Sequence, residues 1–128
     1  MEALILDASV LIGLLDTADS HHDRAIDDVE AGDREGRRLL LPASAYSETL
    51  VAFARAGRLE EARRAITAMG VTVVSLTDTI AERAAELRAR HGRLRLPDAI
   101  VLATAQEIGG NLLSYDRRLS RLASKLPS

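Results

Sequence analysis

The sequence has no cysteine, one lysine and three aromatic residues among its 128 positions. The absence of cysteine excludes disulfides, thiolate metal sites and cysteine nucleophiles. The single lysine, Lys125, lies in a polar C-terminal tail, which excludes chemistry that depends on an interior lysine. Three aromatic residues are too few for an RNA-stacking platform, so Tyr46 and Phe53 are expected in the core or an interface.

The chain also lacks a long hydrophobic run, since no segment approaches the roughly 20 apolar residues that span a bilayer. Its apolar start has no basic region and carries Asp7 in the middle, which argues against a signal peptide. We therefore expect a cytoplasmic protein with no membrane partner. The formal net charge of −2 provides no overall attraction to nucleic acid, although 16 of the 17 basic residues are arginine.

Short apolar runs alternate with helical patterns along the chain. Strands are predicted at residues 3–6, 39–41, 71–74 and 112–113. Helices are predicted at residues 9–15, 21–31, 44–56, 59–69, 77–91, 97–108 and 117–123, with Gly32, Gly57, Gly70 and Gly109 as stop signals. This alternation predicts an α/β fold with a parallel sheet covered on both faces. The length fits one domain over residues 1–128.

Four acidic residues are placed to meet at one end of this sheet. In an open parallel sheet, ligands bind outside the carboxyl ends of the strands. Asp7 directly follows the first strand, and Asp116 follows the fourth. Glu48 lies early in the helix after the second strand, and Asp98 lies in the first turn of its own helix.

Each acid also has a purely structural interpretation. Asp98 could favour the positive end of its helix, Asp116 could be an N-cap, and Glu48 could be an exposed helix residue. Asp7 is harder to explain in this way, because a lone carboxylate in an otherwise apolar segment is costly unless it is paired or binds metal.

Several carboxylates that converge repel one another, and one of them takes up a proton unless a cation neutralises the group. Oxygen ligands without cysteine favour Mg²⁺ or Mn²⁺ over zinc. Such an ion activates a water and stabilises charge on a phosphate. The spacing of the acids therefore supports a metal-dependent phosphodiester hydrolase as a hypothesis.

The chain resembles PIN-domain proteins of the VapC toxin type over nearly its whole length. Four segments carry the resemblance: LILDASVLIGLLD with Asp7, LPASAYSETL with Glu48, LRLPDAIVLATA with Asp98, and LLSYDRRL with Ser114 and Asp116. The resemblance implies a three-layer fold, with a parallel sheet of four to five short strands between helices. It also implies an endoribonuclease that depends on Mg²⁺ or Mn²⁺ and acts as the toxin of a toxin–antitoxin pair.

The resemblance further implies roles for individual residues. Asp7 and Asp98 would be direct metal ligands, while Glu48 and Asp116 would complete the acidic pocket and orient the water. The two serines, Ser9 and Ser114, would hydrogen-bond to these ligands or to the substrate phosphate. The implied partners are RNA, a cognate VapB-like antitoxin and a second copy of the chain.

The chain departs from the family pattern in two places. Ala8 stands where the family usually has a hydroxyl residue. The final segment LASKLPS is short and polar, which puts in doubt the fifth strand that often ends the fold.

Several alternatives remain open. His21, His22 and Asp23 could bind metal, although a solvated helix start explains them better. Another group, Arg88, Arg90, Arg93 and Arg95, could hold RNA phosphates at the pocket rim or form a solvated helix end. A phosphoaspartate enzyme or receiver domain also has an acid after its first strand, but it needs a nearby lysine. A non-catalytic PIN-like domain that binds protein or RNA is the remaining alternative.

Overall fold

The computed structural model describes residues 2–126 and places four short strands in one parallel sheet. The strands are β1 (Leu4–Leu6), β2 (Leu39–Pro42), β3 (Val71–Val74) and β4 (Asn111–Leu113). Their order across the sheet is β3-β2-β1-β4, and all three neighbouring pairs are parallel. The predicted α/β class is confirmed.

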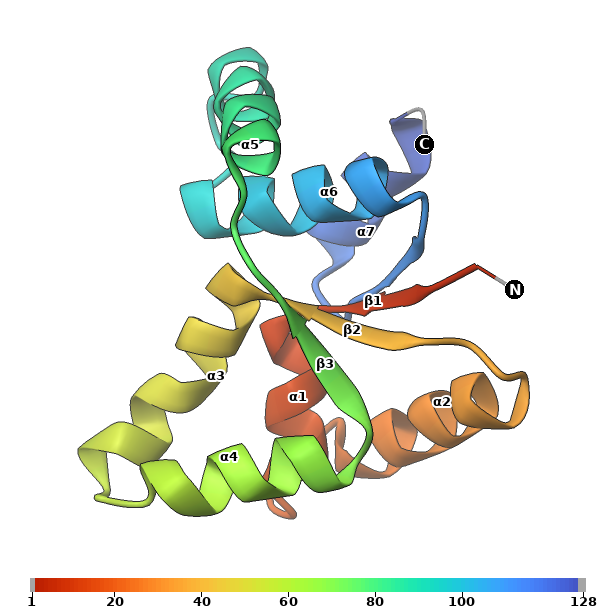
Figure 1. The fold of residues 1–128 in the computed structure, drawn as a ribbon, viewed down its shortest axis with the longest axis vertical. Helices are drawn as coiled ribbons and strands as arrows, with labels where there is room; N and C mark the ends of the chain where they lie inside the picture. The colour runs from red at the N-terminus through yellow and green to blue at the C-terminus, as the bar shows by residue number, and fades with distance from the viewer. Residues whose placement is uncertain (1, 127–128) are drawn as a thin grey trace.

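Seven helices cover the two faces of the sheet within residues 2–126 (Figure 1). They are α1 (Ala8–Leu15), α2 (His22–Arg34), α3 (Ala43–Arg55), α4 (Leu59–Ala68), α5 (Asp78–Arg90), α6 (Leu96–Ile108) and α7 (Arg117–Lys125). In Figure 1, α1 to α4 lie below the sheet and α5 to α7 lie above it. The expected three-layer arrangement is therefore present. None of these helices is long and apolar enough to cross a bilayer.

The central strands are buried on both faces because their side chains alternate between two helical layers. On one face, Ile5 and Leu40 pack with Ala105 of α6. On the other face, Leu6 joins the main core with Leu11 of α1. The outer strands β3 and β4 are only partly buried, as expected at sheet edges.

The order of the strands determines where the site forms. The chain moves outward from β1 through β2 to β3, and then returns to place β4 on the other side of β1. Connections therefore leave the carboxyl ends of β1 and β4 in opposite directions, which opens a crevice between these two strands. Asp7 and Ser114 directly follow those two ends.

One predicted helix end is wrong. The pattern placed the end of the second helix at residue 31 with Gly32 as its stop signal, but α2 continues to Arg34. Gly32 is buried, and a Cβ there would lie 3.0 Å from the Leu4 side chain. This glycine permits close packing of α2 on β1, and the left-handed glycine that follows the helix is Gly36, with φ of 74°.

The C-terminal segment, which the sequence left in doubt as a fifth strand, does not form one within the described residues. Residues 117–125 form α7, so the segment up to Lys125 is helical and the sheet has four strands within residues 2–126. The last two residues of LASKLPS lie outside the described residues.

Candidate active site

Asp7 lies at the centre of the crevice, between the end of β1 and the start of α1. Its residue is only 6% exposed. The carboxylate is the N-cap of α1 and accepts a hydrogen bond of 3.3 Å from the backbone N–H of Val10. The sequence predicts that this acid is buried, and the structure confirms it.

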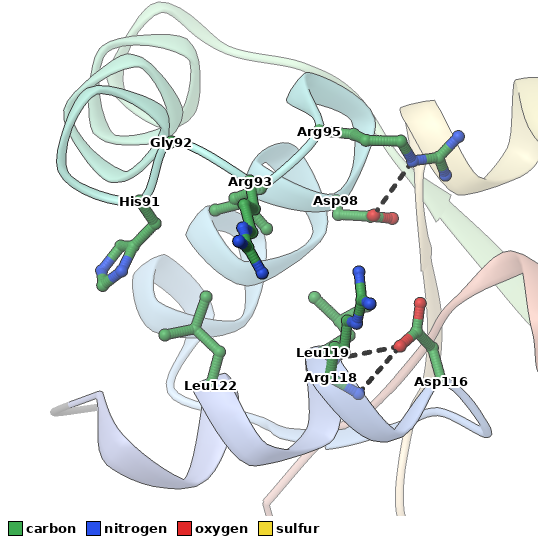
Figure 2. A pocket seen from close by; sticks show the side chains of 10 residues that line it. His91, Gly92, Arg93, Arg95, Asp98, Asp116, Arg118, Leu119 and Leu122 are labelled. Atoms are coloured by element: carbon green, nitrogen blue, oxygen red, sulfur yellow. Dashed lines mark hydrogen bonds and ion pairs between the residues drawn. The ribbon is translucent and has the colours of Figure 1, made fainter.

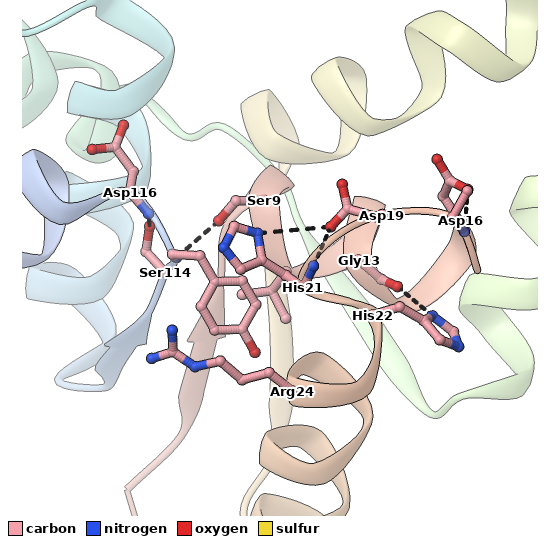
Figure 3. A network of polar contacts seen from close by, with 12 residues as sticks. Ser9, Gly13, Asp16, Asp19, His21, His22, Arg24, Ser114 and Asp116 are labelled. Atoms are coloured by element: carbon pink, nitrogen blue, oxygen red, sulfur yellow. Dashed lines mark hydrogen bonds and ion pairs between the residues drawn. The ribbon is translucent and has the colours of Figure 1, made fainter.

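Two serine hydroxyls hold the Asp7 carboxylate from opposite sides. Ser9 donates to Oδ1 at 2.5 Å, and Ser114 donates to Oδ2. Each serine oxygen also accepts a backbone N–H at 3.0 Å, from Tyr115 to Ser9 and from Asp116 to Ser114 (Figure 3). Because these N–H groups occupy serine lone pairs, each hydroxyl hydrogen is directed to Asp7. The network joins the β1–α1 connection to the β4–α7 connection.

Burial raises the pKa of the Asp7 carboxyl above its ordinary value of 3.8, because desolvation disfavours the charged form. Hydrogen bonds from Ser114, Ser9 and Val10 oppose this shift without cancelling it. The carboxylate is therefore hydrogen-bonded but has too little positive charge beside it, as expected for a group that binds a cation.

This shift predicts how stability depends on pH in the metal-free protein. A raised native pKa means that the contribution of Asp7 to stability is fully present below pH 3.8 and is lost as the pH rises through the native pKa. In EDTA at neutral pH, Asp7→Asn should therefore have a larger free energy of unfolding than wild type. The difference should shrink as the pH falls to about 4, measured by urea unfolding at each pH.

A second aspartate provides the control for this measurement. Asp27→Asn removes a charge from an exposed position on α2 that has no side-chain hydrogen bond or ion pair within residues 2–126. It should follow wild type at every pH. A deficit in the stability of Asp7→Asn at neutral pH would mean that the serine hydrogen bonds outweigh the desolvation of Asp7.

Asp98 and Glu48 approach the crevice from two different helices, and both pair with the guanidinium of Arg95. Asp98 is in the first turn of α6, and its side chain is 19% exposed. Glu48 is in α3, and its side chain is 32% exposed. The guanidinium of Arg95 lies between them, with Nε 3.3 Å from Asp98 and an Nη 3.2 Å from Glu48. Asp98, and to a lesser extent Glu48, raise the pKa of Arg95, which stays charged.

Asp116 has the helix-capping role that was one of its two interpretations from the sequence. It is the N-cap of α7, and its Oδ1 accepts hydrogen bonds from the backbone N–H groups of Arg118 and Leu119 at 2.9 and 3.2 Å. Both bonds use one oxygen. Figure 2 shows the other oxygen turned towards the pocket between α6 and α7.

That pocket has a volume of about 430 Å³ and brings Asp98 and Asp116 to one cavity (Figure 2). Its lining includes both acids, three arginines and an apolar floor: His91, Gly92, Arg93, Leu94, Arg95, Asp98, Asp116, Arg118, Leu119 and Leu122. Asp7 connects to the same region through Ser114, and Glu48 connects through Arg95.

The four predicted acids therefore gather at one end of the sheet but do not form a ready metal cage. Within residues 2–126, no group of three or more histidine, aspartate or glutamate side chains is close enough to hold a metal ion. Asp98 and Glu48 are bridged by the guanidinium of Arg95. The alternative metal site at His21, His22 and Asp23 is likewise not formed among the described residues. His21 stacks on Tyr115, and His22 contacts the carbonyl of Gly13 at 2.7 Å.

Sequence reasoning missed the role of Arg95. It grouped this residue with the other arginines of the segment as a rim for RNA or a solvated helix end. In the structure, Arg90 pairs with Glu86, and Arg88 contacts the carbonyl of Gly92, which fits a solvated helix end. Of these four described arginines, Arg95 alone has a side chain that contacts predicted site residues. No pattern in the sequence pairs it with Glu48, which is 47 positions away.

Three helix N-termini also point to the crevice, because Asp7, Asp98 and Asp116 each lie at the start of a helix. Backbone N–H groups and the helix dipole make such ends favourable for anions. The site thus combines acids that suit a hard cation with helix ends that suit a phosphate. This combination fits the chemistry of phosphodiester hydrolysis.

Comparison with known proteins places the chain in a family. The family model described as PIN domain matches residues 4–125. A toxin–antitoxin complex from Klebsiella pneumoniae is similar in structure, with 25% identity, a TM-score of 0.74 and coverage of 89% of this chain and 87% of that one. No curated protein sequence matches the chain.

Two further solved structures are similar in fold. VapC20 of Mycobacterium tuberculosis, a toxin that cleaves the sarcin–ricin loop, has 19% identity, a TM-score of 0.74 and coverage of 94% and 95%. VapBC-1 of nontypeable Haemophilus influenzae has 17% identity, a TM-score of 0.69 and coverage of 97% and 94%.

Proposed function

Because the chain belongs to the PIN domain family, we propose that it is a metal-dependent endoribonuclease that acts as the toxin of a toxin–antitoxin pair. One observation carries the proposal. The four acids of the family motifs lie beside three helix N-termini and are linked in pairs, Asp7 with Asp116 through Ser114 and Glu48 with Asp98 through Arg95. Asp98 and Asp116 then line one cavity. This arrangement suits a phosphodiester held next to a hard cation.

The residues fit a divalent cation by two criteria. Every candidate ligand is a carboxylate or hydroxyl oxygen, which Mg²⁺ and Mn²⁺ prefer. In addition, the Arg95 guanidinium lies between Glu48 and Asp98, so a cation is already stabilised at this position. Asp7 and Asp98 would hold the ion, with Glu48 and Asp116 completing the acidic pocket. When bound, the ion supplies an activated water and neutralises charge on the phosphate.

Side chains and helix ends of the chain would orient the metal ligands and attract the substrate. Ser9 and Ser114 fix the orientation of the Asp7 carboxylate, so little reorganisation is needed when a cation arrives. Arg95 keeps Glu48 and Asp98 from repelling each other in the absence of metal. The N-terminal N–H groups of α1, α6 and α7 favour the negatively charged substrate at this end of the sheet.

The metal requirement is the direct test. Purified protein should cleave RNA in Mg²⁺ or Mn²⁺ and should stop when EDTA is added, because a cluster of acids alone repels a phosphodiester. Cleavage is measured on labelled RNA by gel electrophoresis, with restoration by excess metal as the control. Undiminished cleavage in EDTA, in a preparation free of contaminating nuclease, would contradict the mechanism.

A non-catalytic domain that binds protein or RNA is the second candidate. The ion pairs of Arg95 with Glu48 and Asp98 favour it, because they neutralise two of the acids without metal. The same assay separates the two functions. RNA that is bound but not cleaved at any tested concentration of Mg²⁺ or Mn²⁺ would identify a binding domain.

The similar structures suggest a protein partner for this chain. Two of the similar structures are complexes of a toxin with its antitoxin. We therefore propose a cognate VapB-like antitoxin that covers the acidic pocket and presents a basic side chain to it, in the position that Arg95 holds here. A homodimer and a cytoplasmic location belong to the same proposal.

A further inference from the structure

A second cavity of about 520 Å³ opens on the other side of α7 from the acidic pocket. It is lined by three arginines, a histidine, a tyrosine and two serines, namely Arg24, Arg117, Arg121, His21, Tyr115, Ser114 and Ser120. None of these lining residues is acidic, which distinguishes this arginine pocket from the cavity that contains Asp98 and Asp116.

The wall of the arginine pocket is built around Tyr115. The ring of His21 stacks on it at 4.8 Å between centroids, and the guanidinium of Arg24 lies 4.5 Å from its centroid. The Tyr115 hydroxyl donates to Asp28 at 2.8 Å, and Arg24 also pairs with Asp28 at 3.7 Å. Figure 3 shows His21 and Arg24 facing the turn that carries Ser114 and Asp116. These contacts hold the wall in place before any ligand binds.

Two of the three arginines of the pocket have no acidic partner among the described residues. Arg117 and Arg121 are exposed, lie one helical turn apart on α7, and have no side-chain hydrogen bond or ion pair within residues 2–126. Like charges at this spacing repel. Arg117 also lies in the first turn of α7, where the helix dipole disfavours a cation and Asp116, the N-cap, is the one acidic residue at this end of the described helix. An anion bound between the two arginines would offset both unfavourable effects.

The pocket shares a residue with the acidic site. Ser114 lines it and also donates its hydroxyl to Asp7. A polynucleotide carries a phosphate at every nucleotide, so a strand with one phosphodiester at Asp7 must place neighbouring phosphates on either side. Arginine binds phosphate oxygens in a planar, bidentate manner.

We propose that the arginine pocket binds a backbone phosphate of RNA next to the phosphodiester that is cleaved at Asp7. This inference rests on the proposed ribonuclease function for the identity of the strand. None of the lining residues is a proposed metal ligand, so binding can be measured in EDTA, without cleavage. Arg117 and Arg121 provide the free charge, and Arg24 with Tyr115 provides the fixed wall.

The test is the double substitution of Arg117→Gln with Arg121→Gln, measured by fluorescence anisotropy of a labelled single-stranded RNA in EDTA. The Kd should rise about tenfold or more at low salt. The slope of log K against log salt should become shallower by about 0.7, since one phosphate contact to a single strand contributes roughly that amount. Melting at or above the wild-type temperature would establish that the double variant is folded.

The chain offers a matched control pair. Arg34 and Arg38 are also exposed, four positions apart and without a side-chain partner in residues 2–126, but they lie near the amino end of β2, away from the acids. Arg34→Gln with Arg38→Gln removes the same charge and should leave the Kd and the salt slope within about twofold of wild type.

The outcomes separate this inference from the proposed function. Equal binding by the two double variants, or no RNA binding by wild type in EDTA, overturns the arginine pocket whether or not the wild type cleaves RNA with metal. Selective loss of binding in the Arg117 and Arg121 variant supports the pocket. If that loss is seen while wild type never cleaves RNA in Mg²⁺ or Mn²⁺, the pocket stands and the nuclease function fails.

Discussion

Asp7→Asn should lower the rate of RNA cleavage by about a hundredfold or more, while the protein stays folded. Asp7 is the most buried of the four acids and is held by two serine hydroxyls and one backbone N–H. Asparagine has nearly the same shape, so the connections after β1 and β4 should keep their positions. The substitution removes the charge on which a cation at this site depends.

The measurement is the initial rate of cleavage of a labelled RNA in saturating Mn²⁺, with circular dichroism to confirm the fold. Asp27→Asn is the control, because it removes the same charge from an exposed position on α2. Induced in a bacterium without an antitoxin, wild type and the control should arrest growth, whereas Asp7→Asn should not. Cleavage by Asp7→Asn at the rate of wild type would remove Asp7 from the catalytic machinery.

The sequence was sufficient to predict the place of Asp7 because the relevant physics is local. A continuous apolar run indicates a strand buried on both faces, and a carboxylate at its end must lie at the edge of the sheet. The burial of Asp7 and the position of Ser114 beside it follow from the parallel pairing of β1 with β4. The residues assigned to this end of the sheet were predicted from their positions after strands or early in helices, together with the motifs.

Contacts between distant segments could not be predicted in this way. The bridge from Arg95 to Glu48 joins α3 to the start of α6, and its geometry depends on how these helices pack. Gly32 illustrates the same limit on the fold. A glycine near the end of a helical pattern usually indicates that the helix ends there. Here the helix continues, and glycine is needed because α2 packs closely against Leu4. Tertiary packing decides both cases.

The role of Asp116 shows that structural and functional interpretations are compatible. Its Oδ1 caps α7, as one interpretation predicted, and its other oxygen faces the pocket that contains Asp98. The cap fixes the rotamer of a candidate site residue. It also places Arg117 and Arg118 at the start of the helix, which is an electrostatically unfavourable position that local rules alone do not explain.

Saturating Mn²⁺ should raise the melting temperature of the wild-type protein on the order of 10 °C. An ion at about 100 times its Kd adds about 2.7 kcal/mol to the native state. For a domain near this size, each kcal/mol shifts the melting temperature by roughly 3–6 °C. Asp98→Asn should gain much less, because it removes one of the two proposed direct ligands. Scanning fluorimetry with a dye measures each shift with and without the metal.

Arg95→Gln should change the metal response in the opposite direction. In the metal-free protein the loss is small, since exposed ion pairs contribute about 0–1 kcal/mol and the Arg95 side chain is 65% exposed. Without the guanidinium, Glu48 and Asp98 repel each other and no cation competes with the ion. Mn²⁺ should therefore bind about tenfold more tightly, equivalent to about 1.4 kcal/mol. At equal Mn²⁺, the gain in melting temperature should exceed that of wild type by several degrees.

Arg58→Gln is the matched control for this comparison. It breaks an arginine–glutamate pair of comparable exposure on α4, with Arg58 55% and Glu61 63% exposed, that has no contact with the acids. Its metal-induced shift should equal that of wild type. The expected order of shifts is then Arg95→Gln above wild type and the control, and Asp98→Asn below them. Equal shifts in all four proteins would mean that the ion binds elsewhere. A smaller shift in Arg95→Gln than in wild type would mean that Arg95 supports the ion instead of competing with it.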